Sequence, residues 1–422
     1  MNCKKTFFLI LILFATRTFS IAQTQISNFS PANIIGGIGE VLNISGSGFG
    51  NQQGNNYVAF MQESGSYLDA TNARSLRYIS WTDNKIQLEM PTAYSGPIMM
   101  NISGTKYTGA DTLKVKANLN YRNAYPLDYT YLVNQNGKGG YTWYIHRTYW
   151  NNPEAKAAIE DVFKEFRCKT GVNFILASQP SDAKLTLNDT INLIAPDASL
   201  GSGGYQYLLW NSCILGSESF YFKKAMDIGL SDKESWDFDT GMVTNGKSKF
   251  RYVLMHELGH AVGLGHVDEL GQTMYPTVTL LPSDNWCERD SITTEEQICM
   301  SYMVTISQNF SFRACGVSPL LKVFNCDDVY GIKASLPLIS AIKNFSIYPI
   351  PSVDIFVIEW INASTKNIFI EVYDMMGKKI QEQTIPNNLL KAQIHLGSCP
   401  AGQYILKIHN GSNTQIEKLL KQ

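Results

Sequence analysis

The chain has 422 residues and a formal net charge of −1, from 35 basic and 36 acidic residues. That length allows about two to four domains and a sizeable buried core. The 44% hydrophobic and 12% aromatic content excludes wholesale disorder, and the balanced charge excludes a nucleic-acid partner bound through phosphate neutralisation.

Residues 1–22 have the composition of a secretory signal peptide. The basic start Lys4–Lys5 precedes an apolar run over residues 6–15, and small residues close the segment at Ser20–Ala22. Arg17 interrupts the apolar run well before the length that a membrane span needs. We therefore expect export, and a mature chain without a transmembrane segment.

Residues 23–117 predict a small all-β sandwich. They are rich in Gly, Ser, Asn and Thr, with short alternating runs at Val41–Ile44 and Tyr57–Phe60. They contain no His and no Cys, so nothing in them points to metal or nucleophile chemistry. The region contains the segments Ile26–Pro31, Gly36–Gly37 and Ile44–Gly50. Their spacing resembles that of an IPT/TIG immunoglobulin-like domain, which implies a spacer or binding module.

Residues 118–340 have a mixed pattern that predicts an α+β domain. Strand-like segments at Tyr141–His146 and Val172–Ala177 flank Pro153–Arg167, whose apolar residues recur at helical spacing. A second helical pattern begins near Ser248. We therefore expect this region to carry the chemistry.

Residues 341–422 return to short strands and predict a third, β-sandwich domain. The strands are expected at four places: Ile355–Trp360, Ile368–Tyr373, Gln393–Leu396 and Tyr404–His409. Three segments, Ile347–Pro351, Val372–Lys378 and Gly402–Lys407, resemble those of a type IX secretion C-terminal sorting domain, except that Ile350 stands where that family usually has Asn. The resemblance implies type IX secretion machinery as a partner, a Bacteroidota-type route through periplasm and outer membrane, and a secreted or cell-surface protein. The alternative is a carbohydrate- or protein-binding β-sandwich.

Three of the six histidines lie within eleven residues. His256 and His260 are four residues apart on a predicted helix, so both imidazoles lie on one face and can bind one Zn²⁺. Glu257 borders the open coordination position, where it can take a proton from water. Gly263 is suited to end the helix, which allows His266 to return as the third ligand.

This motif resembles that of metzincin zinc proteases, and the position of Met274 most resembles the matrixin branch. The resemblance implies one catalytic zinc, a Met-turn at Met274 and a protein or peptide substrate. Val267 departs from the family, because matrixins usually carry Ser or Thr there. Tyr275 follows Met274 directly, so a tyrosine zinc ligand is not expected.

Other parts of the site follow from the same resemblance. Gly203 and Gly204 lie where the family's edge strand pairs with an extended substrate, although a plain glycine loop explains them equally well. Pro276 and Val278 would line the pocket for the residue after the scissile bond. Trp210 is expected in the core.

Six cysteines fall within residues 168–326, an even number consistent with three disulfides in an oxidising compartment. Sequence neighbours such as Cys287 with Cys299, or Cys315 with Cys326, are plausible pairs, and the connectivity is left open. Cys399 stands apart, which indicates a separate domain.

The sequence as a whole predicts a secreted zinc endopeptidase that acts as a monomer. Residues Asp327–Ile332 are similar to the closing helix of matrixin catalytic domains, whose acidic residues tie the Met-turn to the rest of the domain. Calcium sites are typical of matrixins, but no Asp-rich loop is dense enough to assign one. The alternative is a non-catalytic surface adhesin that retains a structural metal site.

Overall fold

The computed structural model describes residues 23–120, 129–186, 189–215, 218–239, 247–276, 291–310, 315–323, 325–331, 345–348, 354–360, 367–374, 378–386, 389, 391–409 and 414–421. The expected signal peptide, Val278 and Cys287 lie outside these residues. The chain divides into two compact units, Met1–Ile332 and Lys333–Gln422.

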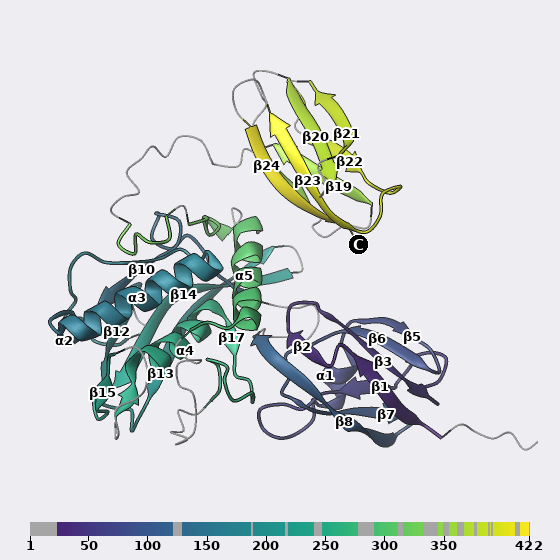
Figure 1. The fold of residues 1–422 in the computed structure, drawn as a ribbon, viewed down its shortest axis with the longest axis horizontal. Helices are drawn as coiled ribbons and strands as arrows, with labels where there is room; N and C mark the ends of the chain where they lie inside the picture. Colours follow the sequence, from purple (N-terminus) through teal and green to yellow (C-terminus); the bar gives the residue numbers. More distant parts are fainter. Residues whose placement is uncertain are drawn as a thin grey trace, which may run out of the picture. The chain divides into compact units, whose positions relative to one another are not determined.

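The first unit begins with two β-sheets (Figure 1). One has the strand order β1-β3-β6-β5, with β1 at Gln25–Ser30, β3 at Val41–Ser47, β5 at Tyr78–Trp81 and β6 at Lys85–Glu89. The other has the order β17-β8-β7-β4, and β2 also pairs with β8. Its strands are β2 at Asn33–Gly36, β4 at Tyr57–Ala59, β7 at Gly96–Ile102, β8 at Thr105–Leu119 and β17 at Leu264–Gly265.

Alternating burial explains why these sheets form a sandwich. Leu42 and Ile44 of β3 are fully buried while their neighbours are less so, which is the period-two pattern of a strand with one face on a core. Met100 and Val115 of the second sheet belong to the same hydrophobic core. The short helix α1, Ala70–Arg74, is capped by Asp69.

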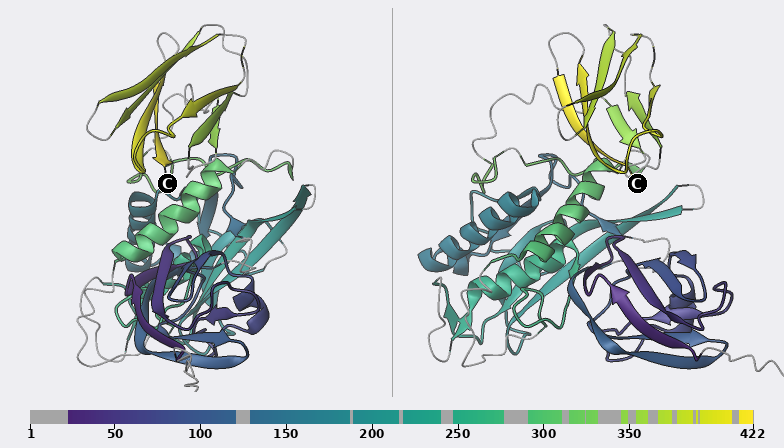
Figure 2. Two further views of the ribbon diagram at one scale, coloured as in Figure 1. Left: turned by 90° about the vertical axis from the view of Figure 1, so that its right-hand side faces the viewer. Right: turned by 45° about the vertical axis from the view of Figure 1, so that its right-hand side comes forward.

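A mixed central sheet follows in the chain. Its order is β11-β10-β12-β14-β13, and β9 also pairs with β14. The strands are β9 at Thr130–Tyr131, β10 at Tyr141–Ile145, β11 at Phe174–Leu176, β12 at Asn192–Asp197, β13 at Gly204–Leu215 and β14 at Glu218–Ser231. All pairs are parallel except β13 with β14, which form a long hairpin extending beyond the other strands of the sheet (Figure 2).

Helices pack against this sheet and against each other. They are α2 at Arg147–Trp150, α3 at Pro153–Thr170, α4 at Phe250–Val262 and α5 at Thr294–Asn309. Asn152 caps α3, Pro153 occupies its first turn and Gly171 ends it with a φ of 76°. The short strands β15, Trp236–Asp237, and β16, Ser248–Lys249, pair just before α4. The predicted helix from Pro153 and the helix beginning near Ser248 are both confirmed.

The disulfides correct one expectation from the sequence. Cys168 pairs with Cys326 and Cys213 pairs with Cys315, so the neighbour pairing of Cys315 with Cys326 is wrong. Cys299 is a free thiol, fully buried in α5, so it forms no bridge to Cys287. Both bridges join segments more than a hundred residues apart, and only the tertiary fold brings such segments together.

The second unit is a β-sandwich with its own core. One sheet holds β18 at Phe345–Tyr348, β19 at Ile355–Trp360 and β22 at Lys391–His395. The other holds β20 at Ile368–Asp374, β21 at Lys379–Ile385, β23 at Gly402–His409 and β24 at Thr414–Lys421. Phe356, Ile394 and Leu406, from both sheets, share one buried cluster. The four strands predicted from the sequence are present with small shifts at their ends.

Among the described residues, none of the helices has both the length and the apolar character needed to cross a membrane.

Candidate metal centre

Helix α4 is buried on almost all sides. Twelve of its residues from Phe250 to Val262 are buried, and a helix that is apolar around its whole circumference belongs inside a domain. Gly263 ends it with a φ of 133°, a backbone conformation that disfavours any residue with a Cβ. The chain then turns through β17, where Leu264 pairs with Leu119, and reaches His266.

The three predicted histidines converge on one point. The Nε2 atoms of His256, His260 and His266 each lie 3.1 Å from the other two. His256 and His260 come from successive turns of α4, and His266 approaches from the segment after it. The chain reversal after Gly263 brings the third ring to the first two, in agreement with the expectation from the sequence.

Hydrogen bonds at the opposite nitrogens fix how the rings are turned. His256 Nδ1 donates to the carbonyl oxygen of Thr273 at 2.8 Å, and His260 Nδ1 donates to that of Leu264 at 2.9 Å. Because a carbonyl oxygen only accepts, the proton sits on Nδ1 and the Nε2 lone pairs face one another. Burial lowers the pKa of His256 to about 4 and that of His260 to about 3, so both rings are neutral, as metal ligands must be.

Glu257 lies beside this cluster and lines the same cavity. It is 6% exposed, and burial raises the pKa of its carboxyl group to about 8. The cavity has a volume of about 470 Å³, and its wall includes all three histidines together with Gly204 and Pro276. One carboxyl group and three imidazoles therefore line the same accessible cavity.

Strand β13 forms the edge of the central sheet beside Glu257. A Cβ on Gly204 would lie 2.9 Å from Glu257 Cγ and 2.8 Å from a methyl carbon of Val253, so only glycine allows the strand this close to α4. Gly203, with a φ of 68°, forms the turn before the strand and donates its N–H to Glu234. The expectation for Trp210 is wrong, since this side chain is 44% exposed on β13.

Met274 packs directly under the metal-site helix. It is 1% exposed, and a Cβ on Gly259 would lie 2.4 Å from its sulfur atom. Gly259 separates the two histidines of α4, so Met274 contacts the helix between them. Met274 therefore packs against α4 between its two histidines.

Glu296 of α5 holds the Met274 segment in place, a role that the sequence analysis gave to the acidic residues near Asp327. Its buried carboxylate accepts the N–H of Met274 at 3.0 Å and that of Thr293 at 3.0 Å. Residues Asp327 to Gly331 form a bend and a turn, so the expected closing helix is wrong. Asp327 instead pairs with Lys164 on α3.

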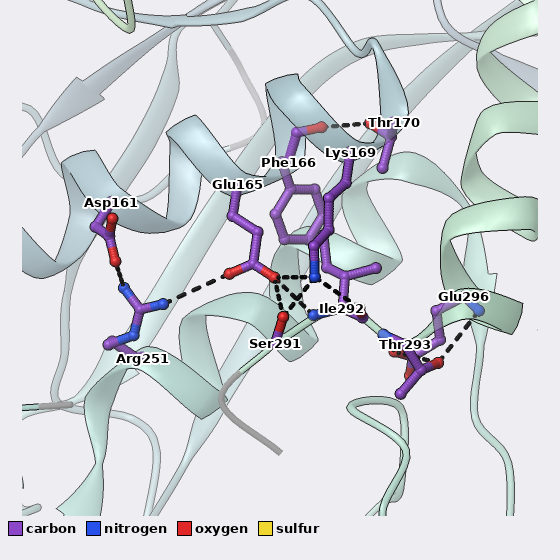
Figure 3. Close-up of polar contacts among 10 residues, drawn as sticks. All are labelled: Asp161, Glu165, Phe166, Lys169, Thr170, Arg251, Ser291, Ile292, Thr293 and Glu296. Atoms are coloured by element: carbon purple, nitrogen blue, oxygen red, sulfur yellow. Dashed lines mark hydrogen bonds and ion pairs between the residues drawn. The ribbon is translucent and has the colours of Figure 1, made fainter. Parts of the chain in front are cut away.

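A polar cluster ties α3, α4 and the start of α5 together (Figure 3). Glu165 accepts hydrogen bonds from Ser291 Oγ at 2.7 Å and from the Ile292 N–H at 2.8 Å. Arg251 of α4, which is 4% exposed, pairs with Asp161 and with Glu165. These contacts fix the segment before α5 and, through it, the turn at Met274.

Lys223 of β14 closes the other end of α4. Its ammonium group is fully buried and donates to the carbonyl oxygens of Ala261 at 2.7 Å and His260 at 3.2 Å. A cation there interacts favourably with the negative end of the helix dipole. Burial nevertheless lowers the pKa of Lys223 to about 7.

Sequence reasoning missed one residue at the centre. Glu63, from the N-terminal sandwich, accepts a 2.7 Å hydrogen bond from Nδ1 of His266. The N-terminal region contains neither His nor Cys, and no local pattern around Glu63 signals a partner 203 residues further along the chain.

The donor set fits zinc. Three imidazoles with converging Nε2 atoms match the ligands that Zn²⁺ takes at about 2.0–2.1 Å. Within the described part of the chain they form a group of three, which leaves a fourth position for water or substrate. An open position is the mark of a catalytic site, whereas a structural site is closed. Three convergent histidines with a glutamate next to the first of them form the arrangement that is typical of three-histidine metallopeptidases.

Comparison with known families agrees with this class. Residues 137–295 match the matrixin family, and residues 346–422 match the secretion system C-terminal sorting domain family. The sorting domain marks the chain for type IX export to the cell surface or the medium. The matrixin domain supports a metalloprotease.

Individual relatives cover short parts of the chain. Matrix metalloproteinase-B of Caenorhabditis elegans is 41% identical over 58 residues, which is 13% of this chain and 11% of that protein, so the chain spans about a ninth of that relative's length. An immunoglobulin-like β-sandwich protein of Bacteroides vulgatus is 18% identical, with 19% of this chain and 85% of that one covered at a TM-score of 0.17. A Bacteroides thetaiotaomicron protein of unknown function is 16% identical, with 26% and 29% covered at a TM-score of 0.19.

Proposed function

We propose that the chain is a secreted zinc-dependent endopeptidase. The convergence of the His256, His260 and His266 Nε2 atoms beside the Glu257 carboxyl group carries the proposal. The three histidines would hold the metal, and Met274 would support them from below. Zinc, when bound, would polarise the scissile carbonyl and lower the pKa of a water molecule.

Glu257 would be the general base. Burial alone raises the pKa of its carboxyl group to about 8, and a cation held by the three histidines would favour the ionised carboxylate that a base requires. Its carboxylate would accept a proton from the attacking water and then deliver it to the amine of the leaving fragment, which is the two-way transfer that peptide hydrolysis needs. The neighbouring backbone supports this role, because Gly204 lets β13 approach Glu257 within van der Waals contact. Substrate and base would then meet along the same strand.

A peptide substrate would bind in an extended form along β13. This strand ends the order of the central sheet, and an edge strand can pair with an added chain through main-chain hydrogen bonds. Gly204, Tyr205 and Gln206 at its start line the cavity with Glu257. Pro276 lines the cavity from the Met274 side, where the pocket for the residue after the scissile bond would lie.

The division of the chain belongs to the same proposal. Residues 23–117 would form the IPT/TIG-like domain, residues 118–340 the catalytic domain and residues 341–422 the sorting domain, after removal of residues 1–22. The two-sheet arrangement of β1 to β8 and the separate core of the second unit support this division.

Replacement of Glu257 by Gln tests the function in the full chain. We expect cleavage of casein or of a peptide library to fall about 10²–10⁴-fold, because the general base is lost while the three ligands remain. Zinc content should stay at one per chain, and a chelator should abolish the wild-type activity. Glu154→Gln, which alters an exposed carboxylate at the start of α3, is the control and should cleave like the wild type.

Two results would contradict the assignment. Full peptidase activity in Glu257→Gln would remove Glu257 as the base. One zinc per chain with no cleavage by the wild-type protein would favour the alternative, an adhesin that keeps the metal site as a structural element.

A further inference from the structure

The third histidine differs from the other two in what holds its ring. His256 and His260 donate from Nδ1 to main-chain carbonyl oxygens that lie near them in the same part of the fold. His266 donates from Nδ1 to the carboxylate of Glu63, at 2.7 Å, in the N-terminal sandwich. One of the three proposed zinc ligands is therefore oriented by a region outside the matrixin domain.

The loop that carries Glu63 is tightly constrained. Gly65 N–H donates to the carbonyl of Gln62 at 2.9 Å, which places Glu63 inside a closed turn, and Gly65 has a φ of 75°. Met61 and Tyr67 form a bridge that closes the base of the loop. The Met61 carbonyl also accepts the N–H of Tyr94 at 2.8 Å. The carboxylate is thus presented from a fixed backbone.

The backbone around His266 is bound to the same sandwich. Asn118, which is 1% exposed, donates to the carbonyl of His266 at 3.1 Å and to that of Ala93 at 2.6 Å. Asp268, two residues further on, accepts the N–H of Ser95 at 3.1 Å. The sandwich therefore fixes both the main chain and the ring of the third histidine.

A second cavity, of about 370 Å³, lies between the N-terminal sandwich and the metal centre, next to the contact of Glu63 with His266. Gln62, Glu63 and Tyr94 line it from the sandwich, and His260 and His266 line it from the metal centre. The sandwich thus forms a wall next to the metal centre, and Glu63 reaches the ligand from that wall.

We propose that Glu63 is a positioning residue of the metal centre, so that the N-terminal sandwich completes the zinc site. This inference rests on the proposed function. A carboxylate on Nδ1 keeps the proton there, turns Nε2 toward the metal and makes the imidazole a stronger ligand. Loss of such a partner typically weakens metal binding about 10–100-fold. The Glu63 side chain is 60% exposed, so solvent competes for it and the loss should fall toward the lower end.

Zinc affinity of the full chain, measured by competition with a coloured chelator, tests the proposal. We expect Glu63→Ala to weaken zinc binding about tenfold. Glu63→Gln keeps an oxygen that accepts from Nδ1, so it should recover part of the affinity. Asp111→Asn, which changes an exposed carboxylate on β8 of the same sandwich, is the matched control and should bind zinc like the wild type.

Two further measurements separate positioning of the ligand from a general effect on folding. The absorption spectrum of the Co²⁺-substituted protein should change in Glu63→Ala and stay unchanged in Asp111→Asn, because it reports the ligand field at the metal. In a His266→Ala background, Glu63→Ala should cause no further loss of zinc affinity, because Glu63 acts through that ring.

The outcomes distinguish this inference from the proposed function. Equal zinc affinity and an unchanged Co²⁺ spectrum in Glu63→Ala and wild type would overturn the inference alone, as would a full loss that persists without His266. Tight zinc binding that depends on Glu63, with no cleavage of any peptide, would overturn the peptidase and leave the inference standing. A folded wild-type chain that binds no zinc would overturn both.

Discussion

The chain has a β-sandwich near each end, and the two differ in how their cores are connected. Buried residues of the N-terminal sandwich, such as Leu42 and Leu119, belong to one hydrophobic core together with Leu264 and with Met303 of α5. The C-terminal sandwich has a separate core that contains Phe356 and Leu406. Similar strand patterns therefore produce one region that is continuous with the metal centre and another that forms a unit of its own.

This difference shows that strand pattern alone does not reveal whether a β-domain is an accessory. In this chain, the contacts of the last strand of the sandwich show that it is continuous with the rest of the first unit. Strand β8 continues to Leu119 and pairs there with β17, the short strand between Gly263 and His266. The N-terminal sandwich is therefore part of the path that brings the third histidine back to the helix.

The largest expected effect comes from Leu119→Ala. Leu119 is fully buried and faces Gly263 at the end of α4, so truncation should destabilise the first unit by about 2–5 kcal/mol. Hydrogen exchange measured by peptide should become faster in both β3 and α4, because they share one core. Leu406→Ala, the matched control, should accelerate exchange only in the second unit. Unchanged protection of α4 in Leu119→Ala would show that the N-terminal sandwich and α4 do not unfold together.

A smaller effect is expected from Asn118→Ala. The side chain bridges both the N–H and the carbonyl of Ala93 and also bonds to the carbonyl of His266, so its removal leaves buried polar groups unpaired. That should cost about 1–3 kcal/mol in the free energy of unfolding, measured with urea. Asn101→Ala, on an exposed hairpin where the side chain bonds to the Gly104 N–H, is the control and should lose less. Equal losses would show that the bridge to His266 adds nothing.

The smallest expected effect is a pH dependence in the C-terminal unit. Hydrogen bonds from Lys379 and Lys407 lower the pKa of Glu371 to about 2. Since the folded pKa lies below the unfolded value, the stabilisation is complete above about pH 4.5 and is lost as the pH falls toward 2. Glu371→Gln should flatten this part of the stability curve of residues 333–422, measured by urea unfolding at several pH values. The control is Glu382→Gln, which removes an exposed carboxylate that also pairs with Lys379, and this variant should retain the acid sensitivity.

The sequence predicted those parts of the site that local spacing controls. Two histidines four residues apart must share a helix face, and a glycine after the helix permits the reversal that returns His266. The structure places all three rings together on that basis. The helix from Pro153 and the four strands of the tail follow from periodicity in the same way.

The parts that sequence could not predict depend on contacts between distant segments. Glu63 and His266 meet across 203 residues, and neither neighbourhood carries a pattern that names the other. The pairing of Cys168 with Cys326 depends on the approach of α3 to the end of the first unit. Glu296 holds the Met274 N–H because the approach of α5 to that turn places it there, and no sequence spacing encodes that approach.

The contact between Gly259 and Met274 constrains how this sequence can vary. With the methionine sulfur only 2.4 Å from the point where a Cβ would lie, even alanine at position 259 would force the Met274 side chain to move from its place against α4. The displacement would fall between the two histidines of the helix. A larger residue at 259 would therefore favour a smaller side chain at 274, so we expect the two positions to vary together across homologous sequences.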